Sequence, residues 1–312
     1  MKLFSKTNFD FLGKRKLFFA VSAVMILVCI VSIVSKRGLN LGIDFTGGSL
    51  NEVRFDRPMS IEELRGVLSG GGLPSFELQS FPLRNAFIIK IKGTGAELET
   101  VRNTVQEILI ANERTKECSI ERTEYVGPTI GKYLTGRAVY AFLFSLAGII
   151  VYVAIRFKST VWGVSGVIAL VHDVFITVGF LSLINREITL TVIAAVLTLA
   201  GYSINDTIVI FDRIRENLSL LRKEPLEKIM NTSINETLSR TVITSTTTLI
   251  VLVVMFFLGG DVLHDFSLTL LFGILLGTYS SVFVASPLVY EWLQRRSTAR
   301  DGSRKINIPR QK

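Results

Sequence analysis

The segment LFFAVSAVMILVCIVSIV, residues 17–34, contains no charged side chain and directly follows the basic run Lys14–Lys16. In a helix it is long enough to begin crossing a hydrocarbon core about 30 Å thick. A cleavable signal peptide also joins basic residues to an apolar core, but such cores usually have only about 7 to 15 residues. We therefore expect a first transmembrane helix at 17–35, preceded by a tail at 1–16.

Five more apolar segments follow along the chain. Their bounds are 138–155, 161–184, 188–211, 241–258 and 266–290. Because 49% of the 312 residues are hydrophobic and only 20% are charged, the chain is too apolar for an ordinary soluble domain. The sequence therefore predicts an α-helical polytopic membrane protein with six transmembrane helices. Its expected parts include a five-helix membrane domain at 138–290, with a loop at 212–240, and a basic tail at 291–312.

The formal net charge is +9, and its distribution predicts the orientation of the spans. Lysine and arginine are retained on the cytoplasmic side of a membrane. They concentrate in the tail at 1–16, in the connections after the second and fourth spans and in the tail at 291–312, whereas the short loops on the other side contain Arg186. Both termini are therefore expected in the cytoplasm. This bias accounts for the positive charge, so nucleic-acid binding is not predicted.

Residues 36–137 change from continuous apolar sequence to alternating and helical periods, which predicts a water-soluble domain on the extracytoplasmic side. The expected elements are a strand at 49–55, a helix at 61–68, strands at 76–81 and 86–91, a helix at 96–111 and a strand at 119–125. Ser60 and Glu63 have the spacing of a capping box for the first helix. This order of elements is that of an α+β ferredoxin-like domain.

An ionisable side chain near the bilayer centre costs on the order of 2.5 to 3.5 kcal/mol, so it marks a proton or ion path, a pairing site or a water-filled cavity. Asp206 lies six residues before Asp212, or roughly 9 Å along a helix, which places it inside the bilayer. It follows Tyr202 and Asn205 in a polar interruption of the fourth span. Asp206 is therefore the first candidate for a titrating group.

Arg240 opens the fifth span and is followed at helical spacings by Thr244, Thr247 and Thr248, which form one polar stripe on that helix. An arginine stays charged at any working pH. If the fourth and fifth spans pack together, Arg240 would pair with ionised Asp206 and release it on protonation. Arg240 could equally extend to the interface as a positive-inside anchor, and the spacing does not decide between these two interpretations.

Two other polar groups lie in or beside the apolar spans. His172 and Asp173, in the third span, fit a relay pair or a structural hydrogen bond between helices. Asp261 and Asp265 flank the last extracytoplasmic turn, where an interfacial position would also explain them. Asp265 begins the sixth helix and is the better candidate for a proton entry site. The same helix contains Gly273 and Gly277, whose spacing predicts close helix packing.

Several stretches together resemble one family. They are Gly42–Gly48 (GIDFTGG), Val126–Pro128, His172-Asp173, Gly201–Asn217 (GYSINDTIVIFDRIREN), Ser239–Leu249 (SRTVITSTTTL) and Gly277–Leu288 (GTYSSVFVASPL). In this order, with six spans and one small domain after the first, they resemble the SecF family of the bacterial Sec protein-export system. That family belongs to the resistance-nodulation-division superfamily.

The resemblance implies a subunit of the inner membrane that works with SecD beside the SecYEG channel and YidC. The proton gradient would then drive late translocation of preproteins, with protons as the coupling ion and no other cofactor or metal. Family motifs map the proton path onto Asp206 and Arg240, with a third acid at Asp265, for which Asp261 competes. The chain is not expected to be an enzyme, and it contains no GxxxxGK[ST] loop for a nucleotide.

Two alternative functions remain at this stage. One is half of a small-molecule efflux transporter from the same superfamily, although such pumps have much larger extracytoplasmic domains than residues 36–137. The other is a passive assembly scaffold for the translocon, in which Asp206 and Arg240 form only a structural ion pair.

Overall fold

The computed structural model describes residues 7–73, 76–81, 85–92, 98–157 and 159–304. The chain divides into two compact units. One contains residues 1–40, 142–186 and 191–312, and the other contains residues 41–141 and 187–190. The first is helical and the second contains a sheet.

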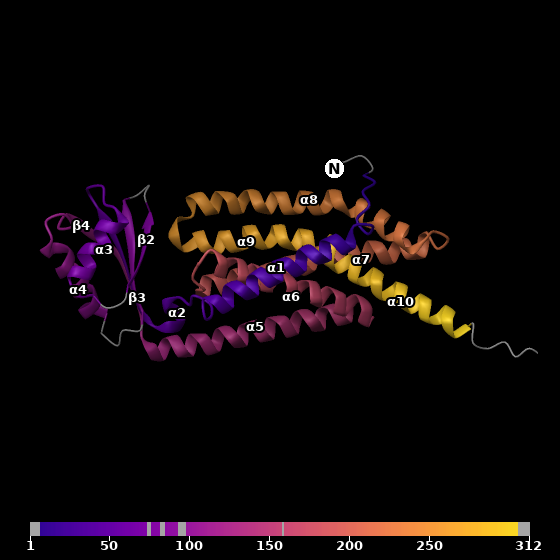
Figure 1. Cartoon of the computed structure of the whole chain (residues 1–312), viewed down its shortest axis with the longest axis horizontal. Coiled ribbons are helices and arrows are strands. Elements are labelled where there is room, and N and C mark those ends of the chain that lie inside the picture. The colour runs from indigo at the N-terminus through magenta and orange to yellow at the C-terminus, as the bar shows by residue number, and fades with distance from the viewer. Residues whose placement is uncertain (1–6, 74–75, 82–84, 93–97, 158, 305–312) are drawn as a thin grey trace, which may run out of the picture. The chain divides into compact units, whose positions relative to one another are not determined.

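The helices include six that are long and apolar enough to cross a membrane (Figure 1). The first five are α1 (Arg15–Ser35), α5 (Pro128–Phe157), α6 (Thr160–Leu183), α7 (Leu190–Leu220) and α8 (Leu226–Leu258). The sixth runs through α9 (Gly260–Ser280), the π-helical turn η2 (Ser281–Ala285) and α10 (Ser286–Arg304). The predicted helical membrane protein with six spans is therefore confirmed.

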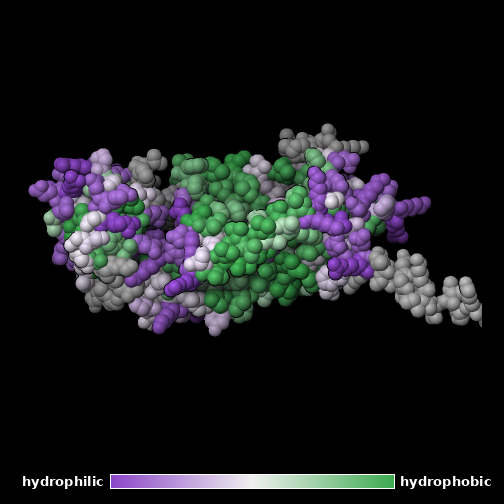
Figure 2. All heavy atoms as spheres, viewed as in Figure 1, coloured by the Kyte–Doolittle hydropathy of each residue, from purple (hydrophilic) through white to green (hydrophobic). Residues whose placement is uncertain are grey.

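Apolar side chains cover the face of the helical bundle that Figure 2 shows, and hydrophilic side chains lie at the end where α7 and α8 meet. Large exposed apolar residues are frequent on α1, α5 and α8, as at Val34, Phe144 and Phe257. Such continuous apolar surface is unusual on a soluble monomer. It is the surface expected of helices that face lipid or partner helices.

The helices extend past the apolar runs that predicted them. The segment 212–240, expected as a loop, is helical except at 221–225, because α7 continues to Leu220 and α8 begins at Leu226. Arg213 on α7 pairs with Glu236 on α8 at 2.7 Å, so polar contacts hold the two helices together there. The apolar pattern marks the end of the hydrophobic face, and a helix with satisfied polar side chains can continue beyond it.

The sheet unit has the strand order of a ferredoxin-like domain. Its elements are α2 (Ile43–Thr46), β1 (Gly48–Phe55), α3 (Ile61–Gly70), β2 (Phe76–Phe81), β3 (Ala86–Lys92), α4 (Leu98–Ala111) and β4 (Cys118–Val126). The sheet order is β2-β3-β1-β4, and all neighbouring strands are antiparallel. The α+β prediction is confirmed in element order and in topology.

Local sequence explains these elements. Ser60 accepts from the Glu63 backbone, and the Glu63 carboxylate accepts from the Ser60 backbone, so the predicted capping box is present. The helices α3 and α4 bury Leu64 and Leu109 against the sheet, where Ile89 is also fully buried. A single apolar core between the two helices and one face of the sheet therefore stabilises the domain.

Adjacent residues of α4 test this core. Leu109 is fully buried and Ile110 is 54% exposed. We expect Leu109→Ala to lower the stability of the domain by about 2 to 5 kcal/mol because it leaves a cavity, and Ile110→Ala to change it by about 0.5 kcal/mol or less. Hydrogen exchange of the β3 amides in the full chain measures both. Equal effects of the two substitutions would contradict this assignment of the core.

Candidate functional site

Asp206 lies where α7 meets α8 and the π-helical turn η2. The Thr241 hydroxyl, on α8, donates to Asp206 Oδ1 at 2.7 Å, and the Ser281 hydroxyl, in η2, donates to Asp206 Oδ2 at 2.6 Å. The carboxyl group is half-buried. It is therefore oriented into the bundle by donors from two neighbouring helices, as a polar group in hydrocarbon requires.

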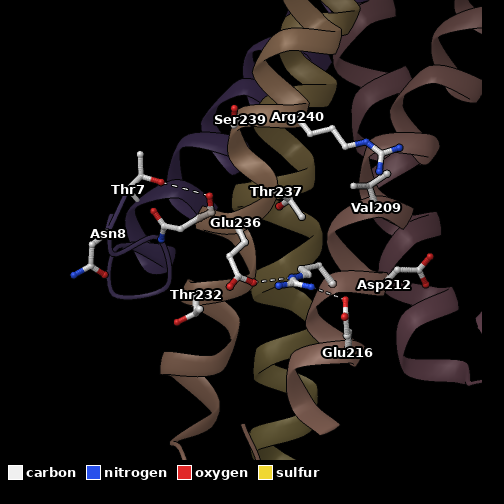
Figure 3. A pocket seen from close by; sticks show the side chains of 12 residues that line it. Thr7, Asn8, Val209, Asp212, Glu216, Thr232, Glu236, Thr237, Ser239 and Arg240 are labelled. Carbon is white, nitrogen blue, oxygen red and sulfur yellow. Dashed lines mark hydrogen bonds and ion pairs between the residues drawn. The ribbon is translucent and has the colours of Figure 1, made fainter. Parts of the chain in front are cut away.

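Arg240 is one residue before Thr241 and lies within electrostatic range of Asp206. Among the side chains that the structure describes, no hydrogen bond or ion pair joins the two. The exposed Arg240 side chain instead lines a polar cavity of about 1020 Å³ between α7 and α8, where it extends toward Val209 (Figure 3). Glu216 and Glu236 line the same cavity. The cavity brings solvent-accessible space to the level of Arg240.

The predicted threonine stripe on α8 does not face Asp206. The Thr244 hydroxyl donates to the backbone oxygen of Arg240 at 2.6 Å, and the Thr248 hydroxyl donates to the backbone oxygen of Thr244 at 3.0 Å. Both bonds lie within the helix itself. The residue that reaches Asp206 is Thr241, which the spacing from Arg240 alone did not single out.

Asp173 forms a second carboxyl site deeper in the bundle. Its side chain is fully buried and contacts His172 Nδ1 at 2.8 Å. The Ser203 hydroxyl on α7 and the Ser280 hydroxyl on α9 both donate to Asp173 Oδ2, at 2.5 and 2.6 Å. The sequence predicted the His172-Asp173 pair, whereas the two serines come from other helices and only the fold identifies them.

The two carboxyl sites are connected through consecutive residues. Ser280 binds Asp173 and Ser281 binds Asp206, at the junction between α9 and η2. Ser286 closes the turn by donating to the backbone oxygen of Ser281 at 2.8 Å. Such single π-turns are rare and often occur at functional sites. The two carboxyl sites are therefore joined at this junction by neighbouring residues of one backbone.

Tyr202 and Asn205 have different surroundings. The Tyr202 hydroxyl lies 3.5 Å from Ser245 Oγ, which in turn bonds to the Thr278 hydroxyl at 2.8 Å. This hydroxyl chain connects α7, α8 and α9. Asn205 is exposed and lines an open groove of about 510 Å³ together with Tyr152 of α5. Asn205 therefore points away from the carboxyl sites.

The structure does not bring Asp265 to Asp206. Asp265 pairs with Arg186 at 3.4 Å and contacts His264 at 3.2 Å, near the start of α9. Sixteen residues of continuous helix, or roughly 24 Å, separate Asp265 from Ser281. Asp261 lies in the first turn of α9, and its side chain is outside the described residues.

Comparison with known proteins gives consistent matches. Residues 106–295 match the family "Protein export membrane protein SecD/SecF, C-terminal", and residues 32–59 match the "SecD/SecF GG Motif". The protein translocase subunit SecF of Endomicrobium trichonymphae is 44% identical over 94% of each chain. The SecF subunit of Rickettsia typhi is 38% identical, also over 94% of each chain.

Two solved structures are also similar. The SecDF protein of Thermus thermophilus, described as a translocon-associated membrane protein, has a TM-score of 0.82 and 39% identity. The match covers 93% of this chain and 39% of that one. A SecDF structure in a super-membrane-facing form has a TM-score of 0.71 and 38% identity, covering 97% of this chain and 41% of that one. This chain therefore spans less than half the length of these SecDF chains.

The Asp173 site predicts a measurable effect on stability. Asp173→Ala removes the acceptor of the Ser203 hydroxyl and the nearer of the two acceptors of the Ser280 hydroxyl, so we expect a loss of about 1 to 3 kcal/mol. Asp173→Asn retains an acceptor oxygen and should lose less. Asp212→Ala is the control, since its ion pair with Arg156 is partly exposed and such pairs contribute roughly 1 kcal/mol or less.

Labelling of the buried thiol of Cys29 during thermal unfolding measures this loss. Cys118 is replaced by serine in all variants, so that only one thiol reports. If Asp173→Ala and Asp212→Ala unfold at the same temperature, the Asp173 cluster does not stabilise the bundle.

Proposed function

This chain belongs to the SecF family of protein translocase subunits, and we propose that it couples proton movement to export through the cluster around Asp206. It is a subunit of the Sec protein-export machinery in the membrane. The observation that carries the proposal is the placement of one half-buried carboxyl between hydroxyl donors from two different helices.

A change in protonation would alter the contacts of this cluster. An ionised carboxylate only accepts hydrogen bonds, whereas a protonated one also donates through its O–H group. Ser281 has a second acceptor available, the backbone oxygen of Thr278 at 3.1 Å. Protonation of Asp206 would therefore let Ser281 turn to Thr278 and free the π-turn η2 from α7. The cluster thus has two hydrogen-bonded arrangements, one for each protonation state.

The energy available is sufficient for such a switch. One elementary charge that crosses a potential of 100 mV yields about 2.3 kcal/mol. That energy changes a two-state equilibrium roughly fiftyfold. The polar cavity lined by Arg240 supports a route for protons between Asp206 and the side of the membrane on which α7 and α8 are joined.

We propose the following surroundings for this cluster. SecD would supply the other half of the membrane core, in keeping with the SecDF chains that extend well beyond the matched region. SecYEG, YidC and the translocating preprotein would be the further partners. Both termini would lie in the cytoplasm and the sheet domain in the periplasm, as the distribution of basic residues indicates. The chain would need no enzymatic reaction of its own.

Asp206→Asn separates this function from a passive scaffold. Asparagine keeps the shape, one acceptor oxygen for one of the two hydroxyls and an amide group that can donate to the other, but it does not titrate. We expect the part of preprotein export that depends on the proton gradient to be lost, while the complex with SecD assembles normally. Glu224→Gln, in the exposed turn after α7 and outside the lining of the cavity, should export like the wild type. Unchanged gradient-dependent export by Asp206→Asn would leave the scaffold as the better explanation.

Reporter fusions test the proposed orientation. Alkaline phosphatase is active only after transfer to the periplasm. Inserted at Glu113, in the exposed turn after α4, it should be active, and fused after Lys312 it should be inactive. The reverse pattern of activities would refute the proposed topology.

A further inference from the structure

The segment Glu187–Leu190 joins α6 to α7 in sequence but belongs to the sheet unit. The Gly42 backbone N–H donates to the Ile188 backbone oxygen at 2.9 Å, and Leu41 forms a parallel bridge with Ile188. The fit is close, because a Cβ at Gly42 would lie 3.0 Å from Thr189 Cγ2 and 3.3 Å from the Ile188 oxygen. The residues ahead of β1 therefore hold this segment through backbone contacts.

Asp44 supplies the cap of α7 from a distant part of the chain. Its carboxylate Oδ2 accepts from the backbone N–H of Leu190, the first residue of α7, at 2.8 Å. The first N–H groups of a helix have no partner within the helix, and a negative charge there interacts favourably with the helix dipole. Asp44 also begins the sequence DFTGG that leads into β1, so the cap is anchored in the sheet unit.

Glu187 makes a second attachment to the sheet unit. Its side chain is only 8% exposed and pairs with Lys90 at 2.6 Å and with Lys92 at 3.3 Å, both on β3. Lys92 also pairs with Glu77 on β2 at 3.0 Å. Burial alone would raise the pKa of Glu77, but the bond and charge of Lys92 outweigh it and lower that pKa. Glu187 is thus held by a charge network that spans two strands.

From these contacts we infer that Asp44 and Glu187 are positioning residues that make the sheet domain follow the movement of α7. The inference rests on the proposed function, because α7 carries Asp206. Leu190 and Asp206 are sixteen residues apart on one unbroken helix, or roughly 24 Å. A displacement of α7 at Asp206 therefore reaches residue 190, where Asp44 and Glu187 pass it to β1, β2 and β3. Without them, the switch around Asp206 operates but the domain does not respond.

Four substitutions in the full chain, assembled with SecD in proteoliposomes, test this linkage, and the fourth is Glu187→Gln. Asp44→Ala removes the cap, Asp44→Asn keeps an oxygen that can cap the helix, and Glu113→Ala removes an exposed carboxylate of the same domain. Each variant is measured for gradient-dependent export. Hydrogen exchange with and without an imposed proton gradient is followed in η2 and in β2 and β3.

We expect Asp44→Ala to lower gradient-dependent export about 5- to 30-fold, the change in population that losing a capping interaction produces. The gradient should still change exchange in η2 but no longer in β2 and β3. Asp44→Asn should recover most of the export, and Glu113→Ala should match the wild type. Glu187→Gln weakens the pairs with Lys90 and Lys92 and leaves the cap intact, and it should also reduce export. If Asp44→Ala does not fold, Glu187→Gln tests the linkage in its place.

Three results would overturn the linkage. In the first, Asp44→Ala and Glu187→Gln keep both export and the response of the strands, while Asp206→Asn loses export. The proposed function at Asp206 is then retained and the linkage is rejected. In the second, Asp44→Ala also loses the response in η2, which means that Asp44 only stabilises the membrane bundle. In the third, the wild type shows no response to the gradient anywhere, and the proposed function fails together with the linkage.

Discussion

A carboxyl group among apolar helices must find its hydrogen bonds within the protein, because no bulk water is available there. This constraint organises the bundle. Asp173 is bound by residues of α6, α7 and α9, and Asp206 joins α7 to α8 and η2. Each aspartate thereby fixes the register of three helical segments. A shift of one helix past another therefore breaks at least one of these bonds.

Small residues on α9 make this arrangement sterically possible. A Cβ at Gly273 would lie 2.4 Å from a methyl carbon of Leu199, and one at Gly277 would lie 3.2 Å from Ser203. The close approach of α9 to α7 at these glycines brings the following residues, Ser280 and Ser281, within reach of the aspartates. The predicted small-residue packing face is therefore confirmed. The same face of α9 leads to the two serines that bind the aspartates.

The sequence predicted two kinds of feature. One depends on a repeating pattern of side chains, and the other depends on the free-energy cost of burying a single ionisable residue. Uninterrupted apolar runs predicted the six spans, alternation predicted the sheet domain, and the cost of burying Asp206 singled it out. It did not predict Thr241, Ser280 or Ser281, because a hydroxyl on an apolar helix is inexpensive and its partner depends on how the helices pack. The helical extensions within 212–240 were missed for a similar reason, since polar contacts between α7 and α8 stabilise them.

The two aspartates that join the helices, Asp173 and Asp206, differ in ways that favour different roles. Asp173 is fully buried and held by three partners, whereas Asp206 is half-buried and held by two hydroxyls. Of the two, Asp206 is the one that bonds to Thr241. Thr241 directly follows Arg240, which lines the polar cavity. A carrier must exchange its proton with water, and a carboxyl that forms more bonds and has less exposure exchanges more slowly. Asp173 therefore suits an anchor that holds Ser280 in place, next to Ser281, the residue that would change its partner in the proposed switch at Asp206.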